Sequence, residues 1–306
     1  MEDLSLLRQA LPYIKLYRNK IFVIKFGGEV VSDQDRMDAL AADLSLLHEL
    51  NIRIVLIHGG GPQATELADK LGIVSEKIEG RRVTDDRMLE VTKMIFAGKI
   101  STDILSALRR HDTPAVGLSG VDGDLVEAVR RPPKKIVDSE TGEVREVDFQ
   151  NVGDIRSVNP HILQVLLENR FVPVVASLGA DGSGKVLNIN ADTIAAEIAG
   201  ALPAEKLFLF SNVSGVLRDA NDPSSRFSYL AVDDAEDLIR SRVVGGGMIP
   251  KVSAAITAVR KGVKRAHIIN GLEHNALLYE VFTVKGLGTM VLDRHEMAAY
   301  LEQEQG

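Results

Sequence analysis

Short runs of apolar residues recur along the chain and are separated by longer amphipathic stretches. The runs are rich in Val, Ile, Leu and Phe and lie at residues 21–26, 52–57, 172–177, 206–210 and 266–269. Because apolar and polar positions do not alternate strictly in them, they predict strands that are buried on both faces. The pattern therefore predicts an α/β protein whose mostly parallel sheet lies between helical layers.

The amphipathic stretches predict helices. Ser32 is expected to cap the first of them, with Asp35 three residues further on. The apolar positions at helical spacing in this first helix are Met37, Leu40, Ala41, Leu44 and Leu47. A second helix follows Asp85, and its predicted buried positions are Met88, Val91, Met94 and Ile95. A third is predicted to bury Ile194, Ala195, Ile198 and Ala199.

Two segments depart from this alternation of strands and helices. At the N-terminus, an apolar stripe predicts a helix that packs either on its own subunit or on a neighbour, and Pro12 is expected to kink that helix or end its first part. The stripe consists of Leu4, Leu7, Leu11 and Ile14. In residues 125–149, alternating segments flank Ser-Glu-Thr-Gly at 139–142, which predicts an antiparallel hairpin.

The composition is that of an ordinary globular protein. The 306 residues are 45% hydrophobic and 26% charged, and 43 acidic against 36 basic side chains give a net charge of −7. This charge opposes general binding to nucleic acid or to an anionic membrane. The absence of cysteine excludes disulfides and thiolate chemistry, and no secretory leader or membrane span is evident. We expect a cytoplasmic protein that binds neither nucleic acid nor membrane.

Glycine-rich segments follow two of the predicted strands. Lys-Phe-Gly-Gly at 25–28 ends the first strand, and His-Gly-Gly-Gly at 58–61 ends the second. Glycines there let the backbone approach a ligand closely, and the N–H groups at the next helix start can bind phosphate oxygens. Neither segment matches the P-loop or the dinucleotide fingerprint. The alternative for each alone is a tight turn.

A third glycine run, at residues 245–247, opens a helix near Pro250 and Lys251. A lysine at the positive end of a helix dipole is unfavourable by ~0.3–1 kcal/mol unless an anion lies nearby. Together with Lys25, Lys251 therefore favours an anion site over a solvated side chain. The Asn-Ile-Asn-Ala-Asp segment at 188–192 precedes another helix, and capping accounts for only one of its three polar side chains. The histidines show no metal-binding spacing, and we assign His58 no catalytic role.

These segments, taken in order, resemble the amino acid kinase family, and within it the kinases that phosphorylate acetylglutamate. They are Lys-Phe-Gly-Gly (25–28), His-Gly-Gly-Gly-Pro (58–62), Gly-Arg-Arg-Val-Thr (80–84), Asn-Ile-Asn-Ala-Asp (188–192) and Gly-Gly-Met-Ile-Pro-Lys (246–251). The resemblance covers about residues 20 to 293. It implies a three-layer α/β/α sandwich with an open sheet: an N-terminal helix in 1–20, an acetylglutamate-binding and dimerising half in 21–180, and an ATP-binding half in 181–306. Residues 179–185 are the expected junction.

The resemblance also implies roles for individual residues. Lys25, Lys251 and Asp192 are the expected catalytic residues. The implied substrate-binding residues are Gly60, Gly61, Arg82, Asn188 and Asn190. The residues implied for ATP binding are Gly27, Gly28, Ser211, Asn212, Gly215, Val216 and Leu217. Mg²⁺ is expected to be held mainly by the nucleotide, with no metal site on the chain. Asn212 stands where the family usually has aspartate, and Glu29 adds negative charge near the phosphates.

A C-terminal segment resembles the arginine site of the arginine-inhibitable kinases. The implied residues are Glu280, Gly286 and Gly288; Glu280 is able to pair with a guanidinium, and the glycine amides with a carboxylate. The alternative is a C-terminal cap of the core with a solvated Glu280. Those kinases also have an N-terminal helix, so a homo-oligomer is expected, either a dimer or a hexamer built as a trimer of dimers.

Two other functions stay open at this point. One is a related kinase of the α-aminoadipate branch of lysine synthesis, whose acidic carrier would bind the basic side chains of the hairpin. These are Arg130, Arg131, Lys134 and Lys135. The other is an inactive amino-acid sensor with the same fold, although Lys25, Asp192 and Lys251 are all present.

Overall fold

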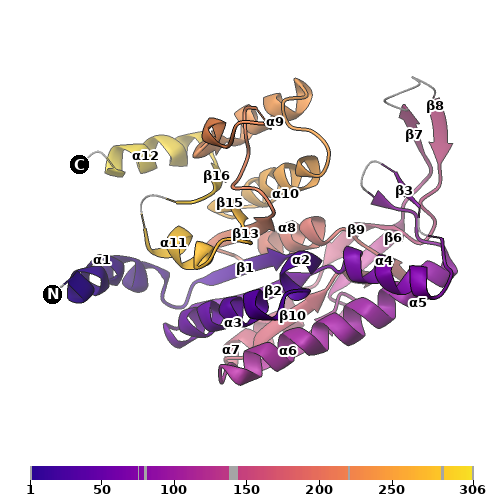
Figure 1. The fold of residues 1–306 in the computed structure, drawn as a ribbon, viewed down its shortest axis with the longest axis horizontal. Helices are drawn as coiled ribbons and strands as arrows, with labels where there is room; N and C mark the ends of the chain where they lie inside the picture. Colours follow the sequence, from indigo (N-terminus) through magenta and orange to yellow (C-terminus); the bar gives the residue numbers. More distant parts are fainter. Residues whose placement is uncertain are drawn as a thin grey trace.

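The computed structural model describes residues 2–74, 76–78, 81–137, 144–219, 221–283 and 286–304. A single eight-stranded sheet crosses the molecule (Figure 1), with the strand order β14-β16-β15-β13-β1-β2-β10-β5. Neighbouring strands are parallel except for the antiparallel pair β15 and β16. The strands are β1 (Ile21–Phe26), β2 (Arg53–His58), β5 (Ala115–Ser119), β10 (Val172–Ala176), β13 (Lys206–Ser211), β14 (Tyr229–Ala231), β15 (Arg265–Asn270) and β16 (Thr289–Leu292).

Alternate side chains of the central strand β1 enter two separate cores. Phe22 and Ile24 pack in one core, whereas Val23 packs in the other. The first core is covered by α2 (Gly28–Val31), α3 (Gln34–Glu49), α4 (Gly61–Lys70), α5 (Asp86–Lys93), α6 (Ser101–Arg110) and α11 (Ala276–Phe282). The second is covered by α7 (His161–Glu168), α8 (Ala191–Ala201), α9 (Val232–Arg240) and α10 (Met248–Arg260). The predicted three-layer sandwich with a mostly parallel sheet is confirmed.

Smaller sheets extend one end of the molecule, at the right of Figure 1. A four-stranded sheet has the order β12-β11-β6-β9, and β3 pairs with β4 as β7 does with β8. The strands are β3 (Lys77–Ile78), β4 (Arg81–Arg82), β6 (Val126–Arg130), β7 (Lys134–Val137), β8 (Val144–Val147), β9 (Gly153–Val158), β11 (Leu178–Ala180) and β12 (Val186–Asn188). The antiparallel pair β7 and β8 confirms the predicted hairpin strands, while the turn at 139–142 lies outside the described residues. Residues 179–185 belong to β11 and its connection to β12.

Two details of the predicted helices were wrong. Asp33, not Ser32, caps α3 by accepting hydrogen bonds from the N–H groups of Asp35 and Arg36, while the Ser32 hydroxyl donates to the Glu29 carbonyl after the short α2. Met94 is 57% exposed instead of buried. It begins η1 (Met94–Ile100), a π-helical segment between α5 and α6 that changes the periodicity by which Met94 was assigned to the core. The other predicted buried positions of these helices are buried.

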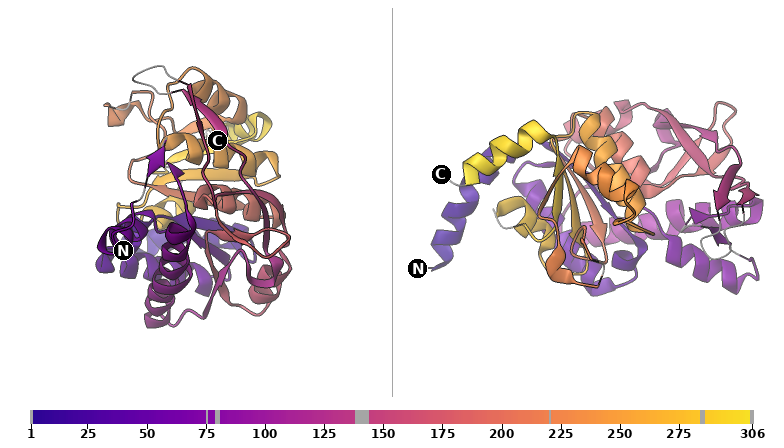
Figure 2. Two further views of the ribbon diagram at one scale, coloured as in Figure 1. Left: turned by 90° about the vertical axis from the view of Figure 1, so that its right-hand side faces the viewer. Right: turned by 90° about the horizontal axis from the view of Figure 1, so that it is seen from above.

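The two terminal helices lie at the end of the molecule opposite the small sheets (Figure 2). α1 (Glu2–Tyr17) contains Pro12 but continues past it, so Pro12 does not end this helix. Tyr17 is 2% exposed and meets the Phe22 ring edge-on, which anchors the end of α1 to its own subunit. The side chains of Leu4 and Leu7 lie outside the described residues. α12 (Arg294–Glu304) contacts β14 at the edge of the sheet.

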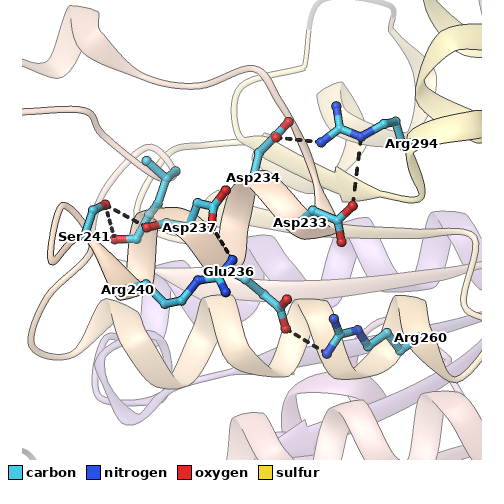
Figure 3. A network of polar contacts seen from close by, with 9 residues as sticks. Asp233, Asp234, Glu236, Asp237, Arg240, Ser241, Arg260 and Arg294 are labelled. Carbon is cyan, nitrogen blue, oxygen red and sulfur yellow. Dashed lines mark hydrogen bonds and ion pairs between the residues drawn. The ribbon is translucent and has the colours of Figure 1, made fainter.

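The helix α9 is tied to its neighbours by ion pairs at the surface (Figure 3). Arg294 of α12 pairs with Asp233 and Asp234, and Arg260 of α10 pairs with Glu236. These side chains are mostly exposed, so each pair contributes at most about 1 kcal/mol. No described helix is long and apolar enough to cross a membrane.

Candidate active site

One buried carboxylate pairs with two lysines at the carboxyl edge of the sheet. Asp192 Oδ1 lies 2.8 Å from Lys25 Nζ, and Asp192 Oδ2 lies 3.3 Å from Lys251 Nζ. The three side chains are between 7% and 15% exposed. The cluster carries a net charge of +1 when all three groups are ionised, so it is suited to bind an anion.

The fold brings this cluster together from three distant segments. Lys25 lies near the end of β1, and Asp192 and Lys251 lie in the first turns of α8 and α10, which pack against each other. A carboxylate is favoured at a helix N-terminus, whereas Lys251 opposes the dipole of its own helix. The arrangement favours an anion beside Lys251, as the glycine run before it predicts.

The electrostatics of the three groups follow from their burial and contact. Burial acts to raise the pKa of Asp192, but the two ammonium groups outweigh it and hold that pKa below its usual range. Burial acts to lower the pKa of Lys25, and the Asp192 carboxylate outweighs it and keeps that pKa raised. The pKa of Lys251 is lowered by burial and then by the charge of Lys25. A bound anion would favour the charged form of Lys251.

The first two glycine loops lie side by side, because β1 and β2 are parallel neighbours. The Gln63 side chain joins them by donating a hydrogen bond of 2.6 Å to the Gly28 carbonyl. A Cβ at Gly60 would lie 2.2 Å from Ile100 Cδ1 and 2.9 Å from the Phe96 ring, so this position requires glycine. The π-helical segment η1 therefore packs directly against the second loop.

A pocket of about 250 Å³, which we call the Arg82 pocket, lies beside the second loop. All five substrate-binding residues implied by the family line it. Its lining residues are Gly59, Gly60, Gly61, Pro62, Arg82, Phe96, Arg131, Val152, Ser177, Asn188, Ile189, Asn190 and Ala191. Gly80, which begins the Arg82 motif, lies outside the described residues.

The polar residues of this pocket have distinct partners. Arg82 Nη2 donates to the Gly61 carbonyl at 2.8 Å and to Thr65 Oγ1 at 2.6 Å, so it also supports the second loop. Asn188 Nδ2 donates to Thr84 Oγ1 at 3.1 Å. Asn190 caps α8 by accepting from the Thr193 N–H at 3.0 Å. Capping accounts for one of the three polar residues in 188–192, as predicted.

A second pocket of about 680 Å³, the Asn212 pocket, lies on the other side of the lysine cluster. It contains five of the seven residues implied for the nucleotide, whereas Gly27 and Gly28 are not among its lining residues and Glu29 is. It is lined by Glu29, Ser211, Asn212, Val213, Gly215, Val216, Leu217, Val243, Val244, Gly245, Gly247, Met248 and Lys251. Lys251 lines this pocket, whereas Ala191, the residue before Asp192, lines the Arg82 pocket. The lysine cluster therefore lies between the two pockets.

Sequence reasoning missed two polar residues of the Arg82 pocket. Ser177 follows β10 at the same sheet edge as the glycine loops, and its buried hydroxyl has no hydrogen-bond partner among the described residues. The same rule that picked out residues after parallel strands would have found it. Arg131 was assigned to a basic patch on the hairpin, but it lines the pocket and donates two hydrogen bonds to Asp154 Oδ1.

The basic patch of the carrier hypothesis is partly neutralised. Arg131 pairs with Asp154, and Arg130 pairs with Asp148 at 2.6 Å. Of the four basic side chains, Lys134 and Lys135 are exposed and have no acidic partner among the described residues. This arrangement does not favour an acidic carrier as the ligand of the hairpin.

A third pocket of about 680 Å³, the Tyr17 pocket, lies between α1 and the C-terminal strands. It contains the three residues implied for an arginine site. It is lined by Tyr13, Leu16, Tyr17, Lys206, Arg226, Ser228, Tyr229, Arg265, Glu280, Val281, Thr283, Gly286, Gly288, Met290 and Tyr300. Lys285, in the C-terminal segment that resembles an arginine site, lies outside the described residues.

Glu280 is buried instead of solvated. Its carboxylate accepts hydrogen bonds from His267 Nδ1 at 2.7 Å and from the N–H groups of Leu287 at 2.8 Å and Gly288 at 3.2 Å. The Gly288 amide therefore binds Glu280 in this state. Burial, followed by the charge of Arg265, lowers the pKa of Lys206 to about 7. The described residues contain no group of three or more His, Asp or Glu side chains that could hold a metal ion.

Comparisons with known proteins show what this chain is similar to. A model of the amino acid kinase family matches residues 20–270. The chain is 43% identical to a curated acetylglutamate kinase of Methanothermobacter thermautotrophicus, over 96% of this chain and 100% of that relative. The structure of N-acetylglutamate synthase from Neisseria gonorrhoeae with coenzyme A and N-acetyl-glutamate has a TM-score of 0.79 and 28% identity, over 95% of this chain and 63% of that chain. The same synthase with coenzyme A and L-arginine has a TM-score of 0.77 and 26% identity, over 95% and 65%. This chain therefore spans less than two thirds of the synthase.

Proposed function

We propose, from the premise that the chain belongs to the amino acid kinase family, that it transfers the γ-phosphoryl group of ATP to the γ-carboxylate of N-acetyl-L-glutamate. It would act as a cytoplasmic enzyme of arginine biosynthesis. The curated relatives support this activity, since they are named acetylglutamate kinase and align along almost the whole chain.

In this reaction the acid occupies the Arg82 pocket, which is lined mainly by the half at 21–180 and completed by residues 188–191. ATP with its Mg²⁺ occupies the Asn212 pocket, which is lined by the half at 181–306 together with Glu29. One carboxylate oxygen forms a bond to the γ-phosphorus while the bond from that phosphorus to the β,γ-bridging oxygen breaks, which gives an acyl phosphate and ADP. The carboxylate is already a nucleophile, so no general base is needed. Lys25 and Lys251 stabilise the charge on the transferring group, and Asp192 positions both lysines.

The position of the lysine cluster between the two pockets supports this reaction most directly. Two ammonium groups on one buried carboxylate leave one positive charge for the phosphoryl oxygens. Incubation of the protein with ATP, Mg²⁺, hydroxylamine and N-acetylglutamate tests the proposed reaction, because hydroxylamine converts an acyl phosphate into a hydroxamate. We expect hydroxamate only when all four components are present.

Arg82 is proposed to bind a carboxylate of the acid. Replacing Arg82 with lysine removes the planar fork and is expected to raise KM for N-acetylglutamate by about 10- to 100-fold, with KM for ATP nearly unchanged. Initial rates with each substrate varied in turn measure this effect. Arg110→Lys is the matched control, since Arg110 pairs with Asp38 on the surface. A change confined to KM for ATP would contradict the assignment.

We further propose that L-arginine inhibits the enzyme by binding in the Tyr17 pocket. The synthase similar to this chain has been solved with L-arginine, and the pocket combines the Glu280 carboxylate with Lys206 and the Tyr17 ring of α1. Because Glu280 already accepts from Leu287 and Gly288, the effector would have to share or displace these bonds. Effector binding would then change the position of α1, which we propose joins dimers into a hexamer.

Millimolar L-arginine is accordingly expected to reduce turnover of the full chain, while deletion of residues 1–18 abolishes this response. The deletion removes Tyr13, Leu16 and Tyr17 from the pocket. Initial rates with and without arginine measure this response in the full chain and in the deletion variant. The mass of each protein in solution gives its oligomeric state. Arginine-insensitive turnover of a full-length protein that is a simple dimer would contradict the regulatory proposal without affecting the proposed reaction.

A further inference from the structure

His58 is a buried histidine that the proposed reaction leaves without a role. It ends β2, directly before the second glycine loop, and its side chain is 0% exposed. Its Nδ1 atom lies 3.0 Å from the carbonyl oxygen of the next residue, Gly59. A carbonyl oxygen only accepts hydrogen bonds, so Nδ1 carries the proton and donates it.

The remaining ring nitrogen fixes the charge of this histidine. His58 Nε2 is buried and has no hydrogen-bond partner in the part of the chain that the structure describes. Burial lowers the pKa of His58 to about 4 and outweighs the opposing effect of the hydrogen bond to the Gly59 carbonyl, so the ring is neutral near pH 7. A neutral ring with its proton on Nδ1 is a hydrogen-bond donor toward Gly59 and does not exchange protons with a substrate under these conditions.

The hydrogen bond to Gly59 determines which way the following N–H group points. In a planar trans peptide, the C=O of Gly59 and the N–H of Gly60 point in opposite directions. The carbonyl is turned toward the buried ring, and Gly60 lines the Arg82 pocket. The described residues give the Gly60 N–H no acceptor within the protein, so this donor is available to a bound ligand.

Without such a bond, this peptide would be free to turn over. Glycine lacks the Cβ that restricts φ and ψ, and this peptide has glycine on both sides. Gly60 must be glycine because Ile100 and Phe96 pack against it, so a bulkier residue cannot restrict the backbone there. A turned peptide would present the Gly59 carbonyl oxygen, instead of an N–H group, to an anionic substrate.

We propose that His58 is a positioning residue for phosphoryl transfer: its Nδ1–H holds the Gly59–Gly60 peptide with the Gly60 N–H facing the reacting carboxylate. The inference rests on the proposed function, since it assigns that carboxylate to the Arg82 pocket. His58 acts through the backbone and does not touch the substrate.

Two isosteric substitutions test this role. Asparagine places its Nδ2 donor near the position of His58 Nδ1, whereas glutamine places its donor near that of Nε2. We expect His58→Asn to keep kcat within about 3-fold of the wild type, and His58→Gln and His58→Leu to lose about 10²-fold in kcat, which is the usual effect of losing one oxyanion donor. KM for ATP should change less than 2-fold in all three. His48→Leu is the control for the loss of a buried imidazole, because His48 lies on α3 and lines neither the Arg82 pocket nor the Asn212 pocket.

The Asn and Gln variants separate the possible outcomes even if the Leu variant does not fold. Rescue by Asn but not by Gln, at equal melting temperatures, supports the positioning role. Equal activity of the Asn and Gln variants, whether high or low, overturns it. A further limb in the wild-type pH–rate profile between pH 5 and 8 that is absent from His58→Asn would also overturn it, because it would make the ring an acid or base. A wild type without N-acetylglutamate phosphorylation contradicts the proposed function instead.

Discussion

Replacing Lys25 with alanine is expected to lower kcat by about 10²- to 10³-fold, because one of two fixed cations would be lost from the transferring phosphoryl group. Lys251→Ala should cause a loss of the same order. The two lysines share Asp192, so the loss in the double variant is expected to be smaller than the product of the single losses. Steady-state kinetics with saturating ATP and N-acetylglutamate measure these values.

Lys20→Ala is the matched control for Lys25→Ala. Lys20 precedes the same strand, but its side chain is 45% exposed and pairs with Glu205 at the opposite end of β1. We expect its removal to leave kcat unchanged. Near-normal turnover in both Lys25→Ala and Lys251→Ala would remove these lysines from the mechanism.

The second large effect is expected for Asp192→Asn. Asparagine keeps the shape of the side chain but leaves two buried ammonium groups without a counter-charge. The expected result is a kcat loss of about 10²-fold or more, together with a loss of roughly 3–5 kcal/mol in the free energy of unfolding. Kinetics and urea unfolding of the purified variant at pH 7 measure the two losses. An Asp192→Asn variant with normal stability would contradict the ion pairs described above.

The pH dependence of stability gives an independent check on Asp192. Its pKa is lower in the folded protein than in the unfolded chain, where it is about 3.9. The stabilisation is therefore present above about pH 4 and is lost as the pH falls through the folded pKa. In the Asp192→Asn variant, this acid-dependent part of the free energy of unfolding should be missing.

Asp43→Asn is the matched control for this stability effect. Asp43 is also buried, on α3, but burial raises its pKa to about 6. Its contribution has the opposite sign, because stability is lost as the pH rises from about 4 toward the folded pKa. At pH 7 the Asp43→Asn variant should consequently be at least as stable as the wild type and should have normal kcat.

The parts of the fold that depend on local pattern could be predicted from the sequence. The five apolar runs coincide with central strands because burial on both faces requires continuous apolar sequence. The errors arose where a tertiary feature changed the local pattern. Met94 is exposed because η1 alters the helical periodicity, and Ser32 is displaced from the cap because α2 ends one residue before it.

The candidate site was predictable as a set of residues but not as a geometry. Glycine segments after two parallel strands, and a third glycine run before Lys251, indicated an anion site. The family resemblance named Asp192 with both lysines as catalytic residues. No sequence pattern indicates that Arg131 turns toward Asp154 and the Arg82 pocket, since this depends on the pairing of β6 with β9. The Glu280 contacts with His267 and the Gly288 amide likewise depend on β15 and β16 meeting in space.

In the proposed reaction, the Arg82 pocket holds N-acetylglutamate with its γ-carboxylate against the lysine cluster. The most direct test is to compare N-acetylglutamate with N-acetyl-α-aminoadipate, which is one methylene longer, as phosphoryl acceptors in the hydroxylamine assay. One methylene changes transition-state binding by ~1–3 kcal/mol, so kcat/KM should favour N-acetylglutamate by about 10- to 200-fold. An equal or higher kcat/KM for the aminoadipate derivative would contradict N-acetylglutamate as the substrate of this pocket.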